Sequence, residues 1–385
     1  GLIDAHVHIE SSLCTPPEFS RAVLPHGVTT VITDPHEIAN VLGLEGIRFM
    51  LERAKHGPLN MYVMASSCVP ATHMGTSGAT LEAEDLQGLL DNPWVPGLAE
   101  VMNYPGVVHG DKSVVDKLNL FREKVIDGHA PGLSGHGLNA YAAARIGSDH
   151  ECTTFEEARE KLRLGLSIFI REGTATPNLD ALLPLVNERT YPQICFCTDD
   201  RIPSSLIEGG SIDMMIRRTM EYGIDPVTAF RMGTLNTARY FGLRDIGAIA
   251  PGKRADLIVI SDLAKMHIDI TLRGGVLVAQ DGITVAPRLP LRKFDLRDTM
   301  NVRGDSLDFR IAAAGSRIRV IGYIRDQIVT EHLQDVARIS EGEVVADPER
   351  DLLKMAVIER HRATGRIGVI NVPVGQFTRY HWLGR

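Results

Sequence analysis

The chain opens with Gly1-Leu-Ile-Asp-Ala-His-Val-His8, an apolar run that ends in two histidines separated by one residue. Side chains two positions apart point to the same face of a β-strand, so His6 and His8 can bind one metal ion together. This stretch predicts a strand that carries a metal-binding pair. Because the sequence begins with Gly inside the strand, we expect it to be a piece of a longer protein.

Seven further strand-like runs follow, and amphipathic segments with helical spacing lie between them. Alternating strands and helices are typical of parallel βαβ units, and eight such units predict a closed (β/α)8 barrel. The predicted strands are Leu2–His8, Val28–Asp34, Met61–Ser67, Val95–Val101, Lys124–His129, Ala143–His150, Leu166–Glu172 and Gln193–Asp199. The predicted helices are Pro17–Leu24, Gly43–Ala54, Leu81–Leu90, Lys112–Lys124, Thr154–Leu164, Leu179–Asn187 and Ser211–Tyr222.

The pattern changes after a predicted helix over Asp225–Phe241. Short strand-like runs separated by Gly or Asp indicate a small β domain, and Pro287-Arg-Leu-Pro290 is typical of a linker. Beyond it, the sequence predicts strands at Arg317–Tyr323 and Val344–Val345 and a helix at Arg350–His361. We therefore expect an α/β fold in three parts: a (β/α)8 TIM-like barrel over 1–242, a small β domain over 243–290 and a truncated C-terminal α/β domain over 291–385.

Composition narrows the class of protein. The apolar share of 44% and charged share of 23% are those of a globular protein. A net charge of −7 without a Lys/Arg run argues against nucleic-acid binding, and no apolar stretch approaches the roughly 20 residues that span a bilayer. Five cysteines without a C-x-x-C pair indicate reduced thiols, so we expect a cytoplasmic protein.

Ten of the fourteen histidines lie in the first 150 residues, and a metal centre would explain this crowding. Active sites of (β/α)8 barrels lie at the C-terminal ends of the strands. Imidazoles and carboxylates stand at five predicted strand ends: His6 and His8, Glu100, His129, Asp149-His150-Glu151, and Asp199. Two histidines and a carboxylate can hold one ion, two further histidines a second, and a shared carboxylate can bridge them. Such donors suit Zn, Fe or Mn.

These motifs resemble the metal-dependent amidohydrolase superfamily and, within it, the bacterial adenine deaminase family. The string Gly247–Val259 (GAIAPGKRADLIV) is similar to the entry of that superfamily into its small β domain. The resemblance implies that residues 243–290 form the second half of that domain and that its N-terminal half is missing. The resemblance spans residues 1 to about 375, and D-P-H-E-I-A-N and S-D-H-E are its most specific parts. The matching stretches are Gly1–Ser12, Thr33–Val41, Leu98–Gly106, Asp127–Tyr141, Ser148–Glu151, Ile170–Gly173 and Thr198–Arg201.

The resemblance implies an enzyme of purine salvage that hydrolyses adenine to hypoxanthine and ammonia, with two divalent ions, iron or manganese and alternatively zinc. It implies that His6, His8 and Asp199 bind the first ion, that His129 and His150 bind the second, and that Glu100 bridges them. As a hypothesis, Asp199 passes a proton from the attacking hydroxide to the leaving amine, and Glu37, Glu151 or Glu172 protonates the ring. The substrate-binding candidates are Asp34, His36, Ser67 and Asp200.

Two other readings stay open. The metal ligands would also suit a dihydroorotase-like or N-acyl hydrolase, because D-P-H-E and S-D-H-E alone indicate the substrate class. A non-catalytic barrel within an assembly is the second alternative. We further expect a homo-oligomer that acts on a small molecule, without a nucleic-acid or membrane partner.

Overall fold

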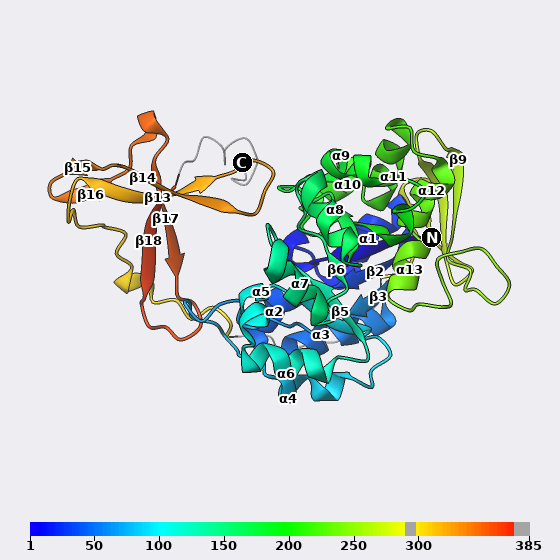
Figure 1. Ribbon diagram of the computed structural model, residues 1–385, viewed down its shortest axis with the longest axis horizontal. Coiled ribbons are helices and arrows are strands. Elements are labelled where there is room, and N and C mark those ends of the chain that lie inside the picture. Colours follow the sequence, from blue (N-terminus) through cyan, green and yellow to red (C-terminus); the bar gives the residue numbers. More distant parts are fainter. Residues whose placement is uncertain (289–297, 373–385) are drawn as a thin grey trace. The chain divides into compact units, whose positions relative to one another are not determined.

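Eight parallel strands follow one another around a barrel in the computed structural model, which describes residues 1–288 and 298–372 (Figure 1). The predicted (β/α)8 barrel is therefore confirmed. Paired strands form the groups β1-β2-β3, β4-β5 and β6-β7-β8. The strands are β1 (Leu2–Val7), β2 (Val28–Thr33), β3 (Asn60–Val63), β4 (Gly97–Val101), β5 (Val125–Gly128), β6 (Ser148–Asp149), β7 (Ser167–Arg171) and β8 (Ile194–Cys197).

Backbone bridges join these groups into a ring. Ala65, beyond β3, pairs with Leu98 of β4, and the Gly147 amide donates to the Ile126 carbonyl at 2.9 Å. Val7 of β1 pairs in parallel with Asp199, which follows β8. Strands such as β2 and β8 are buried along their whole length, which explains why their sequences are rich in apolar and β-branched residues.

Helices between the strands cover the outside of the barrel, and their buried residues recur at helical spacing. In α1, for example, Phe19 and Val23 are buried four positions apart. The helices are α1 (Pro16–Val23), α2 (His36–Leu42), α3 (Leu44–His56), α4 (Ala83–Leu86), α5 (Tyr104–His109), α6 (Lys112–Leu120), α7 (Gly135–Ala143), α8 (Phe155–Arg163), α9 (Leu179–Leu182), α10 (Pro203–Gly209), α11 (Ile212–Glu221), α12 (Pro226–Met232) and α13 (Leu235–Tyr240).

The sixth strand and the helix expected after the eighth strand differ from the prediction. The sixth strand is shorter than expected, because helix α7 extends to Ala143 and only Ser148–Asp149 pairs with β7. The single helix expected over Asp225–Phe241 is divided at Gly233 into α12 and α13. The Gly233 carbonyl accepts a hydrogen bond from the Ile3 amide at 2.8 Å, so this break ties the helices to β1.

The predicted small β domain is an antiparallel sheet in the order β12-β11-β10-β9, within the same compact unit as the barrel, Gly1–Phe294. Its strands are β9 (Leu257–Asp262), β10 (His267–Arg273), β11 (Val276–Gln280) and β12 (Ile283–Thr284). The Thr271 hydroxyl donates to the Leu24 carbonyl at 2.9 Å, and Asn60 of β3 donates to Asp256 at 2.9 Å. These contacts hold the sheet against the barrel.

The second unit, Asp295–Arg385, consists over its described residues of strands and single-turn 3-10 helices. The helix predicted at Arg350–His361 is wrong: β17 pairs in antiparallel register with β18 throughout its length, and its Val357-Ile358 pair suits a strand. The expected α/β character is thus not seen among these residues. The strands are β13 (Arg317–Tyr323), β14 (Thr330–Val336), β15 (Arg338–Ser340), β16 (Glu343–Val345), β17 (Leu353–Ile358) and β18 (Ile367–Val372).

Within the described ranges, no helix has the length and apolar character needed to cross a bilayer. All five cysteines are free. The end of the predicted linker, Leu289-Pro290, and the final residues 376–385 lie outside the described residues.

Candidate metal centre

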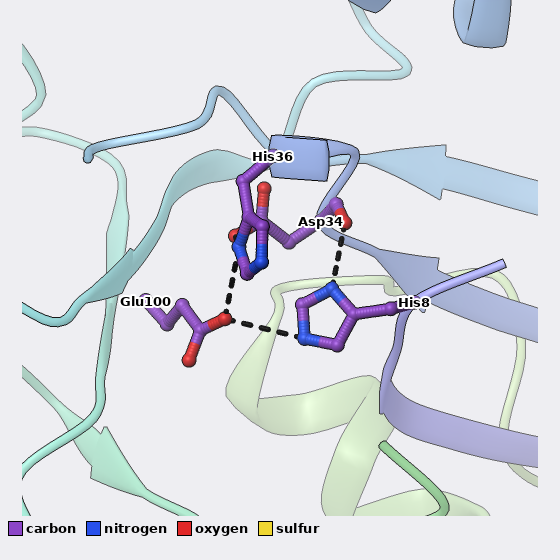
Figure 2. A group of neighbouring side chains, drawn as sticks. All are labelled: His8, Asp34, His36 and Glu100. Carbon is purple, nitrogen blue, oxygen red and sulfur yellow. Dashed lines mark hydrogen bonds and ion pairs between the residues drawn. The ribbon is translucent and has the colours of Figure 1, made fainter. Parts of the chain in front are cut away.

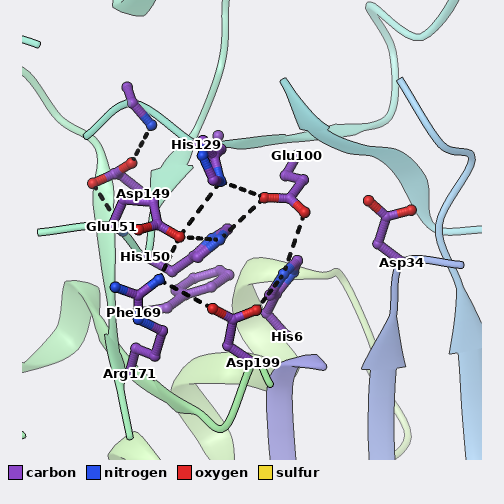
Figure 3. Close-up of polar contacts among 12 residues, drawn as sticks. His6, Asp34, Glu100, His129, Asp149, His150, Glu151, Phe169, Arg171 and Asp199 are labelled. Atoms are coloured by element: carbon purple, nitrogen blue, oxygen red, sulfur yellow. Dashed lines mark hydrogen bonds and ion pairs between the residues drawn. The ribbon is translucent and has the colours of Figure 1, made fainter. Parts of the chain in front are cut away.

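Imidazole and carboxylate side chains from five strands meet at the C-terminal end of the barrel strands (Figures 2 and 3). His6 lies in β1 and Glu100 in β4, while the other four residues directly follow a strand or stand two residues beyond its end. All six are buried except His129, whose side chain is 17% exposed. The six are His6, His8, Glu100, His129, His150 and Asp199.

Four of these side chains converge on one point. The Nε2 atoms of His6 and His8 lie 3.0 Å apart. His8 Nε2 is 3.2 Å from both Glu100 Oε1 and Asp199 Oδ1, and His6 Nε2 is 3.8 and 3.7 Å from the same two oxygens. Two imidazole nitrogens and two carboxylate oxygens that face one another at these distances form a donor set suited to a divalent cation.

The remaining two imidazoles form a second donor group on the other oxygen of Glu100. Glu100 Oε2 lies 2.6 Å from His129 Nδ1 and 3.2 Å from His150 Nε2. Both ring nitrogens of His150 are buried, and neither makes a hydrogen bond within the described part of the chain. A buried nitrogen that faces other donors without a hydrogen bond is what a metal ligand requires, so these residues fit a second cation.

Glu100 therefore offers one oxygen to each group, which is the arrangement of a bridging carboxylate. Burial alone would raise the pKa of Glu100, but the charge and hydrogen bond of His129, with the nearby rings of His150 and His36, hold it well below its ordinary value. The carboxylate is consequently ionised. The Ser67 hydroxyl donates to the Glu100 carbonyl at 2.5 Å and fixes the backbone behind it.

Asp199 occupies a strained backbone position at the end of β8. Its φ angle is 54°, in the left-handed region that few residues other than glycine, Asn and Asp adopt. The Asp199 amide donates to the His6 carbonyl at 2.9 Å, and its carbonyl accepts from the His8 amide at 3.2 Å. Strand β1 thus holds the strained residue beside the two histidines that it faces.

Asp34 supports the first group from β2 (Figure 2). Its backbone carbonyl is 2.9 Å from His8 Nδ1, and so fixes the orientation of that ring. Its carboxylate oxygens contact His36 Nδ1 at 3.0 Å and the Ser66 hydroxyl at 2.8 Å. His36 Nδ1 in turn lies 3.2 Å from Glu100 Oε1. Asp34 and His36 therefore contact the metal-centre residues themselves.

Two further candidates stand close to this group. Glu37 accepts a hydrogen bond from Ser11 through Oε1 at 3.0 Å, and its Oε2 atom lies 3.6 Å from His8 Nδ1. That Oε2 atom is buried and has no hydrogen-bond partner among the described residues. Asp200 is exposed, and its carboxylate approaches His8 and Asp199 closely enough for one ion to contact all three.

Of the two remaining candidates, Glu151 lies beside the second donor group and Glu172 does not. Glu151 Oε1 is 3.5 Å from His129 Nδ1 and 3.4 Å from His150 Nε2, so Glu151 lines the second group. Glu172 accepts from Arg218 at 2.6 Å and from the Leu179 amide at 2.9 Å. Glu172 is thus not brought into the metal centre with the other candidates.

Arg171, a residue that the sequence analysis missed, lies inside the centre. It is 0% exposed, and its guanidinium contacts both Glu151 and Asp199 (Figure 3). Lys161 was also missed: it is buried beside Asp149, the residue before His150. The sequence signal for Arg171 was a basic residue next to an acidic one at a predicted strand end, in Ile170-Arg-Glu-Gly173.

The sequence profile of the amidohydrolase family matches residues 1–278, and that of the adenine deaminase C-terminal domain matches residues 327–375. The chain belongs to the amidohydrolase family. It is 50% identical over 371 residues to the adenine deaminase of Desulfatibacillum aliphaticivorans, and 50% identical over 373 residues to that of Methanothrix thermoacetophila. Each match covers 96% of this chain and 65% of the relative, so the chain spans about two thirds of their length.

Solved structures share the fold. A β-aspartyl dipeptidase from Fervidobacterium islandicum has a TM-score of 0.55 at 18% identity, over 75% of this chain and 85% of that one. An enamidase described as a member of the amidohydrolase superfamily has a TM-score of 0.51 at 18% identity, over 73% of this chain and 80% of that one. These similarities support the barrel architecture.

Proposed function

We propose that this chain carries a centre that hydrolyses adenine to hypoxanthine and ammonia. The proposal rests chiefly on Glu100, whose two oxygens face two separate groups of imidazoles. The similarity to relatives named adenine deaminase supports the choice of substrate within the amidohydrolase family. As parts of the same proposal, the protein acts in the cytoplasm as a homo-oligomer, without a nucleic-acid or membrane partner.

We assign His6, His8 and Asp199 to one divalent cation and His129 and His150 to a second, with Glu100 shared between them. The imidazole and carboxylate donors suit manganese or iron, which the resemblance favours, and also zinc. When bound, the cation pair would lower the pKa of a water molecule so that it can act as a nucleophile near neutral pH.

Hydrolysis adds the oxygen of water to C6 of adenine and breaks the bond from C6 to the amino nitrogen. Of the two protons of water, one ends on the departing amine and the other on N1. We assign the first transfer to Asp199, because its carboxylate lies in the first donor group and can accept and release a proton there.

We assign protonation of N1 to Glu151. N1 and C6 are adjacent ring atoms, so the two residues that move these protons must be neighbours, and Glu151 and Asp199 bond to the same nitrogen of Arg171. Glu151 Oε2 is buried without a hydrogen-bond partner among the described residues, which leaves it available. Asp34, His36, Glu37, Ser67 and Asp200 are the proposed substrate-binding residues.

An elemental metal count together with an ammonia-release assay tests the proposal. We expect two ions per chain and ammonia from adenine, with no turnover of dihydroorotate or acylated amines. Asp199→Asn should lower the turnover number at least ~10²-fold, the usual contribution of a general acid–base group. Hydrolysis of dihydroorotate instead would favour another amidohydrolase, and a metal-free, inactive chain would favour a non-catalytic barrel.

A further inference from the structure

Arg171 is held between two carboxylates and an amide in the interior of the barrel. Its Nη1 atom donates to Asp199 Oδ2 at 3.0 Å and also to Glu151 Oε1 (Figure 3). On the opposite side, Nε and Nη2 donate to Asn178 Oδ1 at 3.3 and 3.0 Å. The guanidinium is therefore anchored from two directions.

The anchoring depends on the shape of arginine. A guanidinium carries its N–H groups in a rigid planar fork, whereas a lysine ammonium is a point charge on a flexible stem. Two carboxylates compensate the charge of the fully buried Arg171, as a buried cation requires. A lysine at this position could supply the charge but not both sets of hydrogen bonds.

The two oxygens of Asp199 consequently have different surroundings. Oδ1 lies 3.2 Å from His8 Nε2 and 3.7 Å from His6 Nε2, within the first donor group. Oδ2 is bonded to Arg171. A carboxylate oxygen has two lone pairs, so Oδ2 keeps one that the arginine does not use.

We propose that Arg171 is a positioning residue that restricts Asp199 to one metal-facing oxygen, Oδ1, and reserves Oδ2 for carrying the proton. This inference rests on the proposed function, because it assigns both tasks to Asp199. This role explains why a fully buried cation lies beside a centre that is expected to bind cations. The Arg171 cation is there because it orients the Asp199 carboxylate.

Removal of the guanidinium should have two opposite effects. Asp199 becomes free to turn both oxygens toward the metal, and one positive charge near the cation disappears, so metal affinity rises. At the same time no oxygen is reserved for the proton, so turnover falls. A purely structural role predicts another outcome, in which affinity and turnover decline together with stability.

The test uses the full chain, freed of metal, as wild type and as Arg171→Met, Arg171→Lys and the control Arg231→Met. The control removes an arginine that donates to the Tyr191 hydroxyl at 2.7 Å, outside the centre. Mn²⁺ affinity is measured from the electron paramagnetic resonance signal of free Mn²⁺ in competition with a chelator. The turnover number for adenine is measured on the loaded chains, and thermal unfolding on the metal-free ones.

We expect Arg171→Met to tighten Mn²⁺ binding ~10-fold, because a like charge beside the cation is gone. Its turnover number should fall ~10²-fold or more, the usual cost of disabling a general acid–base group. Arg171→Lys should keep Mn²⁺ affinity near that of wild type yet lose at least ~10-fold in turnover, since charge alone does not orient Asp199. The control should match wild type in both quantities.

Weaker or unchanged Mn²⁺ binding by Arg171→Met would overturn the proposal, as would full turnover by Arg171→Lys. If Arg171→Met does not fold, the turnover number of Arg171→Lys decides alone. A wild-type chain that binds Mn²⁺ without deaminating adenine would refute only the proposed function, since the affinity comparison still reports on Asp199. A wild-type chain that binds no Mn²⁺ overturns both.

Discussion

Asp4 and Thr198 bond to each other where the first barrel strand meets the last. Asp4 Oδ2 accepts from the Thr198 hydroxyl at 2.5 Å, and Oδ1 accepts from the Thr198 amide at 3.1 Å. Both residues are buried. Because Asp4 stands two positions before His6 and Thr198 directly precedes Asp199, this contact fixes the two strands that supply the first donor group.

Thr198→Val tests how far this contact stabilises the barrel. The variant keeps the shape of the side chain but leaves Asp4 Oδ2 buried without its hydroxyl donor, which should cost about 1–3 kcal/mol of unfolding free energy. Chemical unfolding of the metal-free chain measures the loss. Ser261→Ala removes an exposed hydroxyl that donates to Asp269 at 2.9 Å, and it should change stability by less than about 0.5 kcal/mol. Equal effects of the two variants would contradict the prediction.

Glu100→Gln tests whether Glu100 is shared between the two donor groups. The amide has a single oxygen and no charge, so it can serve one donor group at most, and the metal content should fall from two ions per chain to one or none. Elemental analysis after dialysis measures the content, with Glu123→Gln on the exposed surface as the control. A Glu100→Gln chain that retains two ions would remove Glu100 from the bridging role.

Lys161→Met tests the support behind the second donor group. Lys161 Nζ donates to Asp149 Oδ2 at 2.9 Å and to the Ala130 carbonyl at 2.7 Å, and Asp149 Oδ1 accepts from the Ala130 amide at 2.7 Å. The pair thereby joins the residues next to His129 and His150.

Loss of Lys161 leaves Asp149 as a buried, unpaired charge, so unfolding free energy should fall by about 3–5 kcal/mol. The double variant Lys161→Met/Asp149→Asn, which removes both charges, should recover part of the loss in chemical unfolding. Lys117→Met serves as the control, because this buried lysine donates to the Ser67 carbonyl at 2.9 Å and has no acidic partner among the described residues. A double variant no more stable than Lys161→Met would show that the charge pair is unimportant.

His26 makes stability depend on pH outside the centre. Burial disfavours its charged form, but the hydrogen bond and charge of Asp213, 2.9 Å away, outweigh burial and the opposing charge of Arg201, so the pKa of His26 is raised above 6.5. A raised pKa in the folded state stabilises the fold below the unfolded-state pKa, and this gain is lost as pH rises through the folded-state pKa. The stability advantage of wild type over Asp213→Asn should therefore shrink from pH 6 to pH 9 in urea unfolding. An advantage that grows over this range would contradict the assignment.

The six candidate donors named from the sequence lie together in the structure, because a general rule places the active residues of a barrel at the C-terminal strand ends. At the end of β7 the sequence offered Glu172 as one of three candidates for protonating the ring, whereas the structure places Glu172 on Arg218 and Arg171 beside Asp199. Neighbouring residues of a strand point to opposite faces, so an error of one position exchanges the interior side chain for an exterior one. Tertiary contacts also explain two other differences from the prediction. The helix expected over Asp225–Phe241 is interrupted at Gly233, whose carbonyl accepts a hydrogen bond from β1. The helix expected over Arg350–His361 is instead strand β17, which pairs with β18.

Asp199 pairs with His6 and His8, although these residues stand at opposite ends of the barrel sequence. The first donor group is therefore complete only when the first and last strands meet. A ribosome-bound or proteolysed fragment that ends before β8 would contain His6, His8 and Glu100 but not Asp199. Completion of the first donor group, which we propose binds a cation, therefore coincides with closure of the barrel ring.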